Sequence, residues 1–290
     1  MPRQVRSWMF VPGNREKFIS KARASAADCV LLDIEDGVLP AEKAEARHMI
    51  AAAVSKPWTG GPAVFVRVNA LSTPWLKDDL EQVVLPGVDG ICLTKVTRAP
   101  DIHVLADMLD ALERRRGIPA GQLKILAAVE SARGLLNASQ IADAHPRVHA
   151  LMFGAEDYAL DIGLGARREK EAAELIYARS SIVVAAAAAN ILSIDGVYPN
   201  LDDPAGLLAD TNQARRLGFT CKSTFNPRQI EVINQVFSPQ PHEIDYARKV
   251  AQGFREAEAR GDASVAVGGQ LVDRPILLRA LRLLETIGEK

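Results

Sequence analysis

Short apolar runs rich in β-branched residues alternate along the chain with longer stretches of helical period. Such runs predict strands that helices cover on both faces, because these strands have no polar side to present to water. The predicted strands are Ser7–Val11, Cys29–Asp33, Val64–Val68, Gly90–Thr94, Ile125–Val129, Ala150–Phe153, Leu192–Ile194 and Thr220–Ser223. The predicted helices are Arg15–Ala24, Ala41–Ala53, Trp75–Val83, Asp101–Arg116, Leu135–Ala144, Ala172–Ala189 and Pro204–Leu217.

Eight strands that alternate with helices fit either a closed barrel or an open, doubly wound sheet. No Gly-x-Gly-x-x-Gly sequence follows any predicted strand, so an open dinucleotide-binding sheet loses its main support. A barrel of eight strand and helix units needs roughly 250 residues, and the chain has 290. The pattern therefore predicts an α/β fold, a (β/α)8 TIM barrel over residues 1–237.

The pattern changes after the predicted barrel. A Pro-containing break at Ser238–Pro241 precedes a charged helix around Glu243–Arg260, a polar Gly-rich turn and a final helix that begins at Pro275. Because the eight strands are already used, residues 238–290 are predicted to form a C-terminal helical arm or lid. The alternative is a helix that simply packs on its own barrel.

Composition and charge argue against several kinds of partner. The formal net charge is −1 and no basic run interrupts the even mixture of signs, so nucleic acid is not expected as a partner. No apolar run approaches the ~18 residues of a spanning helix, so no membrane partner is expected either. Cys29, Cys92 and Cys221 are scattered without metal-ligand spacing, which fits a reducing compartment and predicts a cytoplasmic location.

Polar residues follow most of the predicted strands. The active site of a TIM barrel lies at the carboxyl ends of its strands, so these residues are predicted to converge on one rim. They are Asp33, Glu35 and Asp36 after strand two, Arg67 and Asn69 at the end of strand three, Lys95 after strand four, Glu130 after strand five, and Glu156 and Asp157 after strand six. None of the five histidines falls at a strand end, so a Ser-His-Asp triad has little support.

Carboxylates crowded at one rim repel each other unless a cation shares the site. Glu130 and Asp157 offer hard oxygen ligands with no cysteine or clustered histidine nearby, which favours magnesium or manganese over zinc. Arg67 supplies a planar cationic fork that suits a carboxylate or a developing oxyanion. The alternatives are that each carboxylate is a helix cap or loop charge, and that Arg67 forms a structural salt bridge.

Eight short motifs span nearly the whole chain: Arg6–Gly13, Leu32–Gly37, Val66–Asn69, Val129–Gly134, Phe153–Asp157, Ile194–Val197, Asp202–Pro204 and Val272–Pro275. Each motif is weak alone, but their order and spacing together are specific. Through them the chain resembles the citrate lyase β-subunit-like lyases of the HpcH/HpaI aldolase superfamily, which include malyl-CoA and citramalyl-CoA lyases.

The resemblance implies roles for particular residues. Glu130 and Asp157 would bind Mg2+, and Arg67 would contact the acyl substrate near the scissile bond. Coenzyme A, as part of an acyl-CoA substrate, would be contacted by Phe10, Arg15 and Lys21.

The resemblance also implies a role for the C-terminal extension. Asp273 lies where the family places an acidic residue on a lid that closes over a neighbouring subunit's site, which implies a homo-oligomer, a trimer or a hexamer. Two departures lie near the rim. Phe225-Asn-Pro227 stands where the family commonly has Ile-His-Pro, and Thr94 stands where a Pro usually precedes the lysine. Substrate preference is therefore expected to differ from that of better-known members.

The expected activity is Mg2+-dependent cleavage, or formation, of a short 3-hydroxyacyl-CoA thioester such as malyl-, citramalyl- or citryl-CoA by a retro-Claisen step. Metal binding would lower the pKa of the substrate hydroxyl, and Arg67 would stabilise developing charge. Asp273 would carry a proton as acid or base. The residues expected to hold metal-bound waters and Arg67 in place are Asp33, Glu35, Asp36 and Lys95.

Three alternative functions stay open. The first is a class II aldolase that acts on a free 2-oxo acid without a thioester. The second is a citrate lyase β subunit that works on an acyl carrier protein thioester. The third is a non-catalytic acyl-CoA-binding barrel, against which the intact Arg67, Glu130 and Asp157 speak, because a decayed site tends to lose its clustered charges first.

Overall fold

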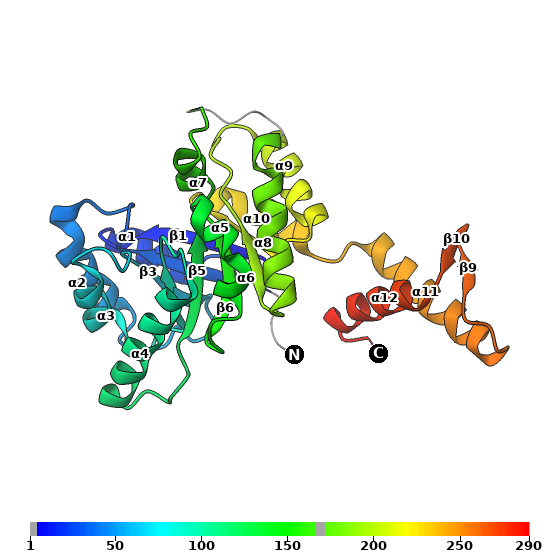
Figure 1. The fold of residues 1–290 in the computed structure, drawn as a ribbon, viewed down its shortest axis with the longest axis horizontal. Coiled ribbons are helices and arrows are strands. Elements are labelled where there is room, and N and C mark those ends of the chain that lie inside the picture. Colours follow the sequence, from blue (N-terminus) through cyan, green and yellow to red (C-terminus); the bar gives the residue numbers. More distant parts are fainter. Residues whose placement is uncertain (1–4, 166–171, 290) are drawn as a thin grey trace. The chain divides into compact units, whose positions relative to one another are not determined.

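Eight parallel strands close into a barrel in the order in which they occur along the chain (Figure 1). The computed structural model describes residues 5–165 and 172–289. The strands are β1 Ser7–Pro12, β2 Cys29–Asp33, β3 Ala63–Val68, β4 Gly90–Leu93, β5 Lys124–Val129, β6 Val148–Phe153, β7 Leu192–Asp195 and β8 Cys221–Thr224. Each strand pairs with the next, and β8 pairs with β1, so the predicted TIM barrel is confirmed.

Alternate residues of each strand point to opposite sides of the barrel wall. In β3, Val64 and Val66 belong to the core between strands and helices, whereas the ring of Phe65 lies inside the barrel, 4.8 Å from that of Trp8. Arg67 follows Phe65 by two positions and therefore points inward as well, near the carboxyl end of β3. The alternation thus carries a basic side chain to the mouth of the barrel.

Helices surround the strands on the outside (Figure 1). They are α1 Glu16–Arg23, α2 Lys43–Ala53, α3 Leu76–Val83, α4 Ala99–Arg116, α5 Ala132–Leu136, α6 Ala138–Ala142, α7 Ala155–Asp161, α8 Ile176–Ala188, α9 Pro204–Leu217 and α10 Ile230–Phe237. Within the described ranges no helix has the length and hydropathy needed to cross a membrane.

The helices differ from the prediction in three places. The predicted helix Leu135–Ala144 is in fact the two short helices α5 and α6, because Asn137 interrupts it and donates its side-chain amide to Thr97 O at 2.8 Å. The helices α7 and α10 were not predicted. Each spans about two turns, which is too short for a helical period to stand out in the sequence.

The chain from Ser238 onward forms a compact unit of its own, and Val5–Phe237 forms the other. The elements of the C-terminal unit are α11 Pro241–Ala259, β9 Val265–Val267, β10 Gln270–Val272 and α12 Arg274–Thr286. The expected Gly-rich turn is the tip of an antiparallel hairpin between β9 and β10. Gly268 and Gly269 both have positive φ there, 56° and 80°, which a two-residue hairpin turn of the primed type requires.

Candidate active site

A buried ion pair joins the end of β2 to the end of β3. Arg67 donates from Nε and Nη2 to the two carboxylate oxygens of Asp33, each at 2.7 Å. Only 12% of the Arg67 side chain and 3% of the Asp33 side chain are exposed. Burial alone would lower the pKa of Arg67, but the charge and hydrogen bonds of Asp33 outweigh it and raise that pKa. The two parallel bonds fix the plane of the guanidinium.

The loop after β2 folds around the same carboxylate. Glu35 N donates to Asp33 Oδ1 at 2.9 Å, and Gly37 N donates to Oδ2 at 3.0 Å. A Cβ at position 37 would lie 2.2 Å from Asp33 Oδ2, so only glycine allows so close an approach. Asp33 therefore holds both Arg67 and the loop that carries Glu35.

Glu35 lies between two cations. Its Oε2 is 3.3 Å from Arg67 Nη1, and its Oε1 accepts a hydrogen bond from Lys95 Nζ at 2.7 Å. Lys95 Nζ also lies 3.4 Å from Asp36 Oδ2. Burial raises the pKa of Glu35, while the Arg67 charge and the Lys95 hydrogen bond act in the opposite direction. The structure thus groups these predicted rim residues with Arg67, and the chemical role of each stays a prediction.

Lys95 adopts a left-handed backbone conformation, with φ of 55°. Few residues other than glycine do so, because the conformation costs energy, and such residues gather at functional sites. Lys95 N donates to Glu130 Oε1 at 2.6 Å, while the ammonium of the same residue bonds Glu35. One residue therefore links the loop after β2 to the end of β5.

Glu130 and Asp157 form a pair of neighbouring carboxylates beyond β5 and β6. Burial, and then the charge of Asp157, raise the pKa of Glu130 to about 7. Gly154 leaves room for this carboxylate, since a Cβ there would lie 2.4 Å from Glu130 Oε2. In the described part of the chain no group of three or more Asp, Glu, His or Cys side chains could hold a metal ion. The pair therefore offers hard oxygen donors, but not a complete ligand set.

An aromatic stack lies across the mouth from β8 to β3. The guanidinium carbon of Arg67 is 4.7 Å from the centre of the Phe10 ring, and the Phe225 ring packs on Phe10 with centroids 4.9 Å apart. Phe10 is buried, whereas Phe225 is 56% exposed. Phe225 was not among the predicted site residues. Its sequence signal was the departure from the Ile-His-Pro pattern at this loop.

The remaining predicted site residues are Arg15, Lys21 and Asp273. Arg15 lies in the turn between β1 and α1, Lys21 lies in the last turn of α1, and both are exposed. Asp273 is exposed in the C-terminal unit, where its Oδ1 accepts a hydrogen bond from Ile276 N at 3.3 Å and so caps α12. Contacts of Arg15 and Lys21 with coenzyme A, and catalysis by Asp273, stay predictions.

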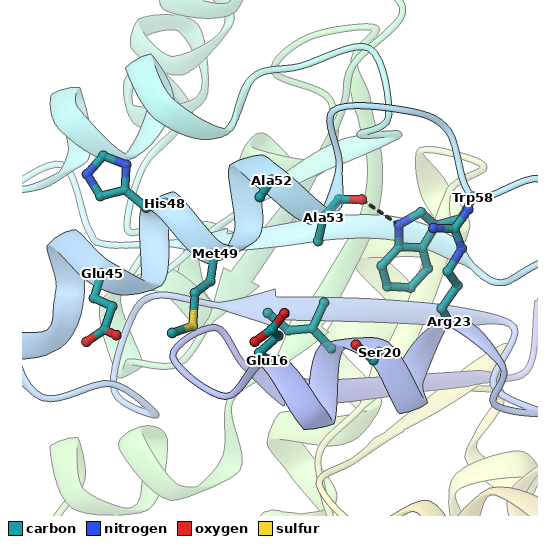
Figure 2. A pocket seen from close by; sticks show the side chains of 10 residues that line it. Glu16, Ser20, Arg23, Glu45, His48, Met49, Ala52, Ala53 and Trp58 are labelled. Carbon is teal, nitrogen blue, oxygen red and sulfur yellow. Dashed lines mark hydrogen bonds between the residues drawn. The ribbon is translucent and has the colours of Figure 1, made fainter.

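A separate groove of about 850 Å3 lies between α1 and α2 (Figure 2). Ile19 and Met49 contribute apolar surface to it, and Arg23 lies over the ring of Trp58 at 5.8 Å. Trp58 Nε1 donates to Ala53 O at 3.0 Å, which holds the ring in place. None of the strand-end carboxylates lines this groove, so the chemistry suggested by the sequence belongs to the mouth of the barrel.

The fold and the mouth define a TIM-barrel enzyme, because such enzymes draw their catalytic groups from the carboxyl ends of several strands. Residues 6–227 match the family HpcH/HpaI aldolase/citrate lyase. The chain is 39% identical to the citrate lyase subunit beta of Leuconostoc mesenteroides subsp. cremoris, over 97% of this chain and 92% of that protein. It therefore belongs to the HpcH/HpaI aldolase/citrate lyase family, and the predicted family and lyase class are confirmed.

Two further comparisons add to this assignment. The chain is 34% identical to a (3S)-malyl-CoA thioesterase of Cereibacter sphaeroides, over 96% of this chain and 93% of that protein. It superposes on the crystal structure of CitE from Mycobacterium tuberculosis in complex with magnesium, acetoacetate and coenzyme A with a TM-score of 0.83. The identity in that comparison is 31% and all of both chains is covered. The likeness thus extends over barrel and C-terminal unit alike.

Proposed function

We propose that this chain is a Mg2+-dependent carbon–carbon lyase that cleaves a short 3-hydroxyacyl-CoA thioester of the malyl, citramalyl or citryl type by a retro-Claisen step. The observation that carries the proposal is the arginine locked at the barrel mouth beside a carboxylate pair. The solved relative with magnesium, acetoacetate and coenzyme A supports the choice of metal and thioester. A manganese ion, which prefers the same ligands, is an expected substitute.

The donor set fits magnesium. Burial and the charge of Asp157 raise the pKa of Glu130, so a cation held between the two carboxylates would offset their repulsion. Mg2+ is commonly bound by one or two carboxylates and keeps several positions for water or substrate oxygens. Glu130 and Asp157 would hold the ion. When bound, it supplies Lewis-acid stabilisation for the oxygen of the substrate hydroxyl.

The chain's own residues account for the rest of the step. The 3-hydroxyl gives up its proton to solvent water, the bond between C2 and C3 breaks, C3 becomes a carbonyl carbon, and the electron pair of the broken bond passes to the thioester as an enolate. Arg67 presents a guanidinium fixed by Asp33 and Glu35, so it can stabilise the enolate oxygen without reorganising. Asp33, Glu35, Asp36 and Lys95 maintain that orientation.

The protonation step requires an acid. We propose that Asp273 of a neighbouring subunit supplies the proton to the α-carbon of the released acyl group, which requires a homo-oligomer. Asp273 is exposed and begins a helix after the hairpin turn at Gly268 and Gly269. An exposed carboxylate on a compact unit separate from the barrel can serve a second subunit. A trimer or a hexamer is the expected assembly.

The test is a panel of malyl-, citramalyl- and citryl-CoA, incubated with the purified chain in Mg2+ or in excess chelator. Release of one oxo acid for each short acyl-CoA, in Mg2+ only, is the expected result. Arg67→Lys should lower kcat/KM on the order of 100-fold, because an ammonium cannot reproduce the bidentate fork. Arg147→Lys is the matched control, because Arg147 is a buried arginine paired with Glu113 away from the mouth.

Other products would point to other functions. Free coenzyme A together with an intact hydroxy acid would mean thioester hydrolysis, the activity named for the Cereibacter relative. Cleavage of a free 2-oxo acid aldol without any thioester would mean a class II aldolase. Activity only with an acyl carrier protein thioester would make this chain a citrate lyase β subunit in the strict sense. Binding without turnover would mean a non-catalytic acyl-CoA-binding barrel.

A further inference from the structure

A buried lysine lies directly beneath the loop that carries Glu35. Lys43 is the first residue of α2 and is only 4% exposed. Its Nζ donates to Ile34 O at 2.7 Å and to Glu35 O at 2.9 Å. The same Nζ lies 5.0 Å from the centre of the Trp75 ring. The buried ammonium is therefore surrounded by two carbonyls and an aromatic face.

The two carbonyls belong to the segment that positions Arg67. Ile34 follows β2 directly, and Glu35 contacts Arg67 with its side chain at 3.3 Å. The carbonyl of Ile34 accepts a second, longer bond from Asn69 Nδ2 at 3.4 Å. The carbonyl of Glu35 also accepts from Val38 N at 3.1 Å. Since β2 ends at Asp33, both carbonyls lie beyond the strand, and Lys43 is the one residue that bonds both of them among the hydrogen bonds of the described residues.

A second layer of polar groups supports this arrangement. Asp79 accepts from Arg47 Nε at 2.7 Å and from Asn69 Nδ2 at 2.6 Å, and it is fully buried. Lys43 and Arg47 are successive basic residues on the buried face of α2. Lys43 bonds the loop after β2. Arg47 bonds Asp79, which also bonds Asn69 just after β3.

We infer that Lys43 is a positioning residue of the active site: its ammonium clamps the backbone of the loop after β2 and thereby fixes Glu35 and Arg67. The kinetic part of this inference rests on the proposed function, whereas the structural part does not. Without the clamp the loop still pairs with Arg67 through Asp33, and Glu35 N still donates to Asp33, but the carbonyls of Ile34 and Glu35 lose their bonds to the lysine. The value of kcat should therefore change more than KM for the thioester.

Lys43→Met keeps the length and apolar stem of the side chain and removes the charge and both hydrogen bonds. The matched control is Arg116→Met. Arg116 is also a basic residue at a helix end that donates to two backbone carbonyls, those of Glu81 and Val84. These carbonyls belong to α3 and to its C-cap residue, away from the rim residues.

The first readout is amide hydrogen exchange of Glu35, Asp36 and Gly37 in the full chain without substrate. Each of these amides donates to a carboxylate within the loop. In Lys43→Met they should exchange on the order of 10-fold faster, because the loop opens more often. Exchange in β2 and β3 should stay unchanged. Arg116→Met should leave the exchange of the loop amides at the wild-type rate.

The second readout is kinetic. Lys43→Met should lower kcat for the thioester on the order of 10- to 100-fold and leave KM within about threefold. Trp75→Leu removes only the aromatic face. It should also raise the exchange rate of the loop amides and lower kcat, but by less than Lys43→Met does. If Lys43→Met does not fold, Trp75→Leu replaces it in both measurements. Wild-type exchange of the loop amides in either folded variant would overturn the clamp. Accelerated exchange with unchanged kcat would overturn the link to Arg67. If the wild-type chain cleaves no thioester, the proposed function fails while the exchange result still decides the clamp.

Discussion

Asp33→Asn isolates the ion pair on which the site depends. The Asp33 carboxylate accepts from two nitrogens of Arg67 and from the amides of Glu35 and Gly37. An asparagine has one acceptor oxygen, so its amide nitrogen faces donors. Removing one partner of a buried ion pair costs about 3 to 5 kcal/mol. Because Glu35 still contacts Arg67 at 3.3 Å, we expect the lower end, about 3 kcal/mol of unfolding free energy.

Urea unfolding of the Asp33→Asn variant measures this loss, and steady-state kinetics on the folded protein measures the effect on the site. We expect kcat to fall on the order of 100-fold, because a misoriented guanidinium no longer meets the developing charge. Asp28→Asn is a matched control. Asp28 also holds an arginine through both oxygens, with Arg6 Nε at 2.9 Å and Nη2 at 3.1 Å, but before β1 and β2 begin.

The control Asp28→Asn should lower the free energy of unfolding, but kcat of the folded protein should stay at the wild-type value. An equal loss of kcat in Asp33→Asn and Asp28→Asn would rule out a positioning role for Asp33, since the effect would then come from general loosening of the barrel. Unfolding of Asp33→Asn at the wild-type urea concentration would show that the Arg67 pair contributes nothing measurable to stability.

Three further predictions concern the metal, the aromatic stack and the C-terminal unit. Glu130→Gln should abolish Mg2+-dependent turnover with a wild-type circular dichroism spectrum, and full activity in excess chelator would exclude the metal. Phe225→Ala should lower kcat/KM about two- to tenfold, the worth of one aromatic pair, and an unchanged value would leave Phe225 without a role. Co-expressed Asp273→Ala and Arg67→Ala chains should regain activity in hybrids verified by native mass spectrometry, and inactive hybrids would show that Asp273 does not serve a neighbour.

The strand ends were predictable because carboxyl ends of parallel strands converge in any closed barrel. Asp33, Arg67 and Glu130 could therefore be placed on one rim from the sequence. Their mutual bonds could not, since the bidentate pair depends on the parallel register that sets Asp33 beside Arg67. The left-handed turn at Lys95 was also hidden, because no glycine or asparagine marks it.

The burial of Lys43 has a signal in the sequence. The buried positions of α2 are Lys43, Ala46, Arg47 and Ile50, which follow the i, i+3, i+4, i+7 spacing of a core-facing stripe. Two basic residues on such a stripe require buried partners, so they indicate a polar network beneath the strands. Which carbonyls Lys43 would meet depended on the path of the loop after β2, and that path follows from tertiary contacts.

In the proposed reaction a carbon–carbon bond breaks and an enolate is then protonated on carbon. We would run the reaction in D2O with Mg2+ and malyl-CoA and measure the products by mass spectrometry. We expect acetyl-CoA that carries one deuterium in its methyl group, together with an equal amount of oxo acid. Free coenzyme A with unlabelled malate and no oxo acid would contradict the proposed reaction.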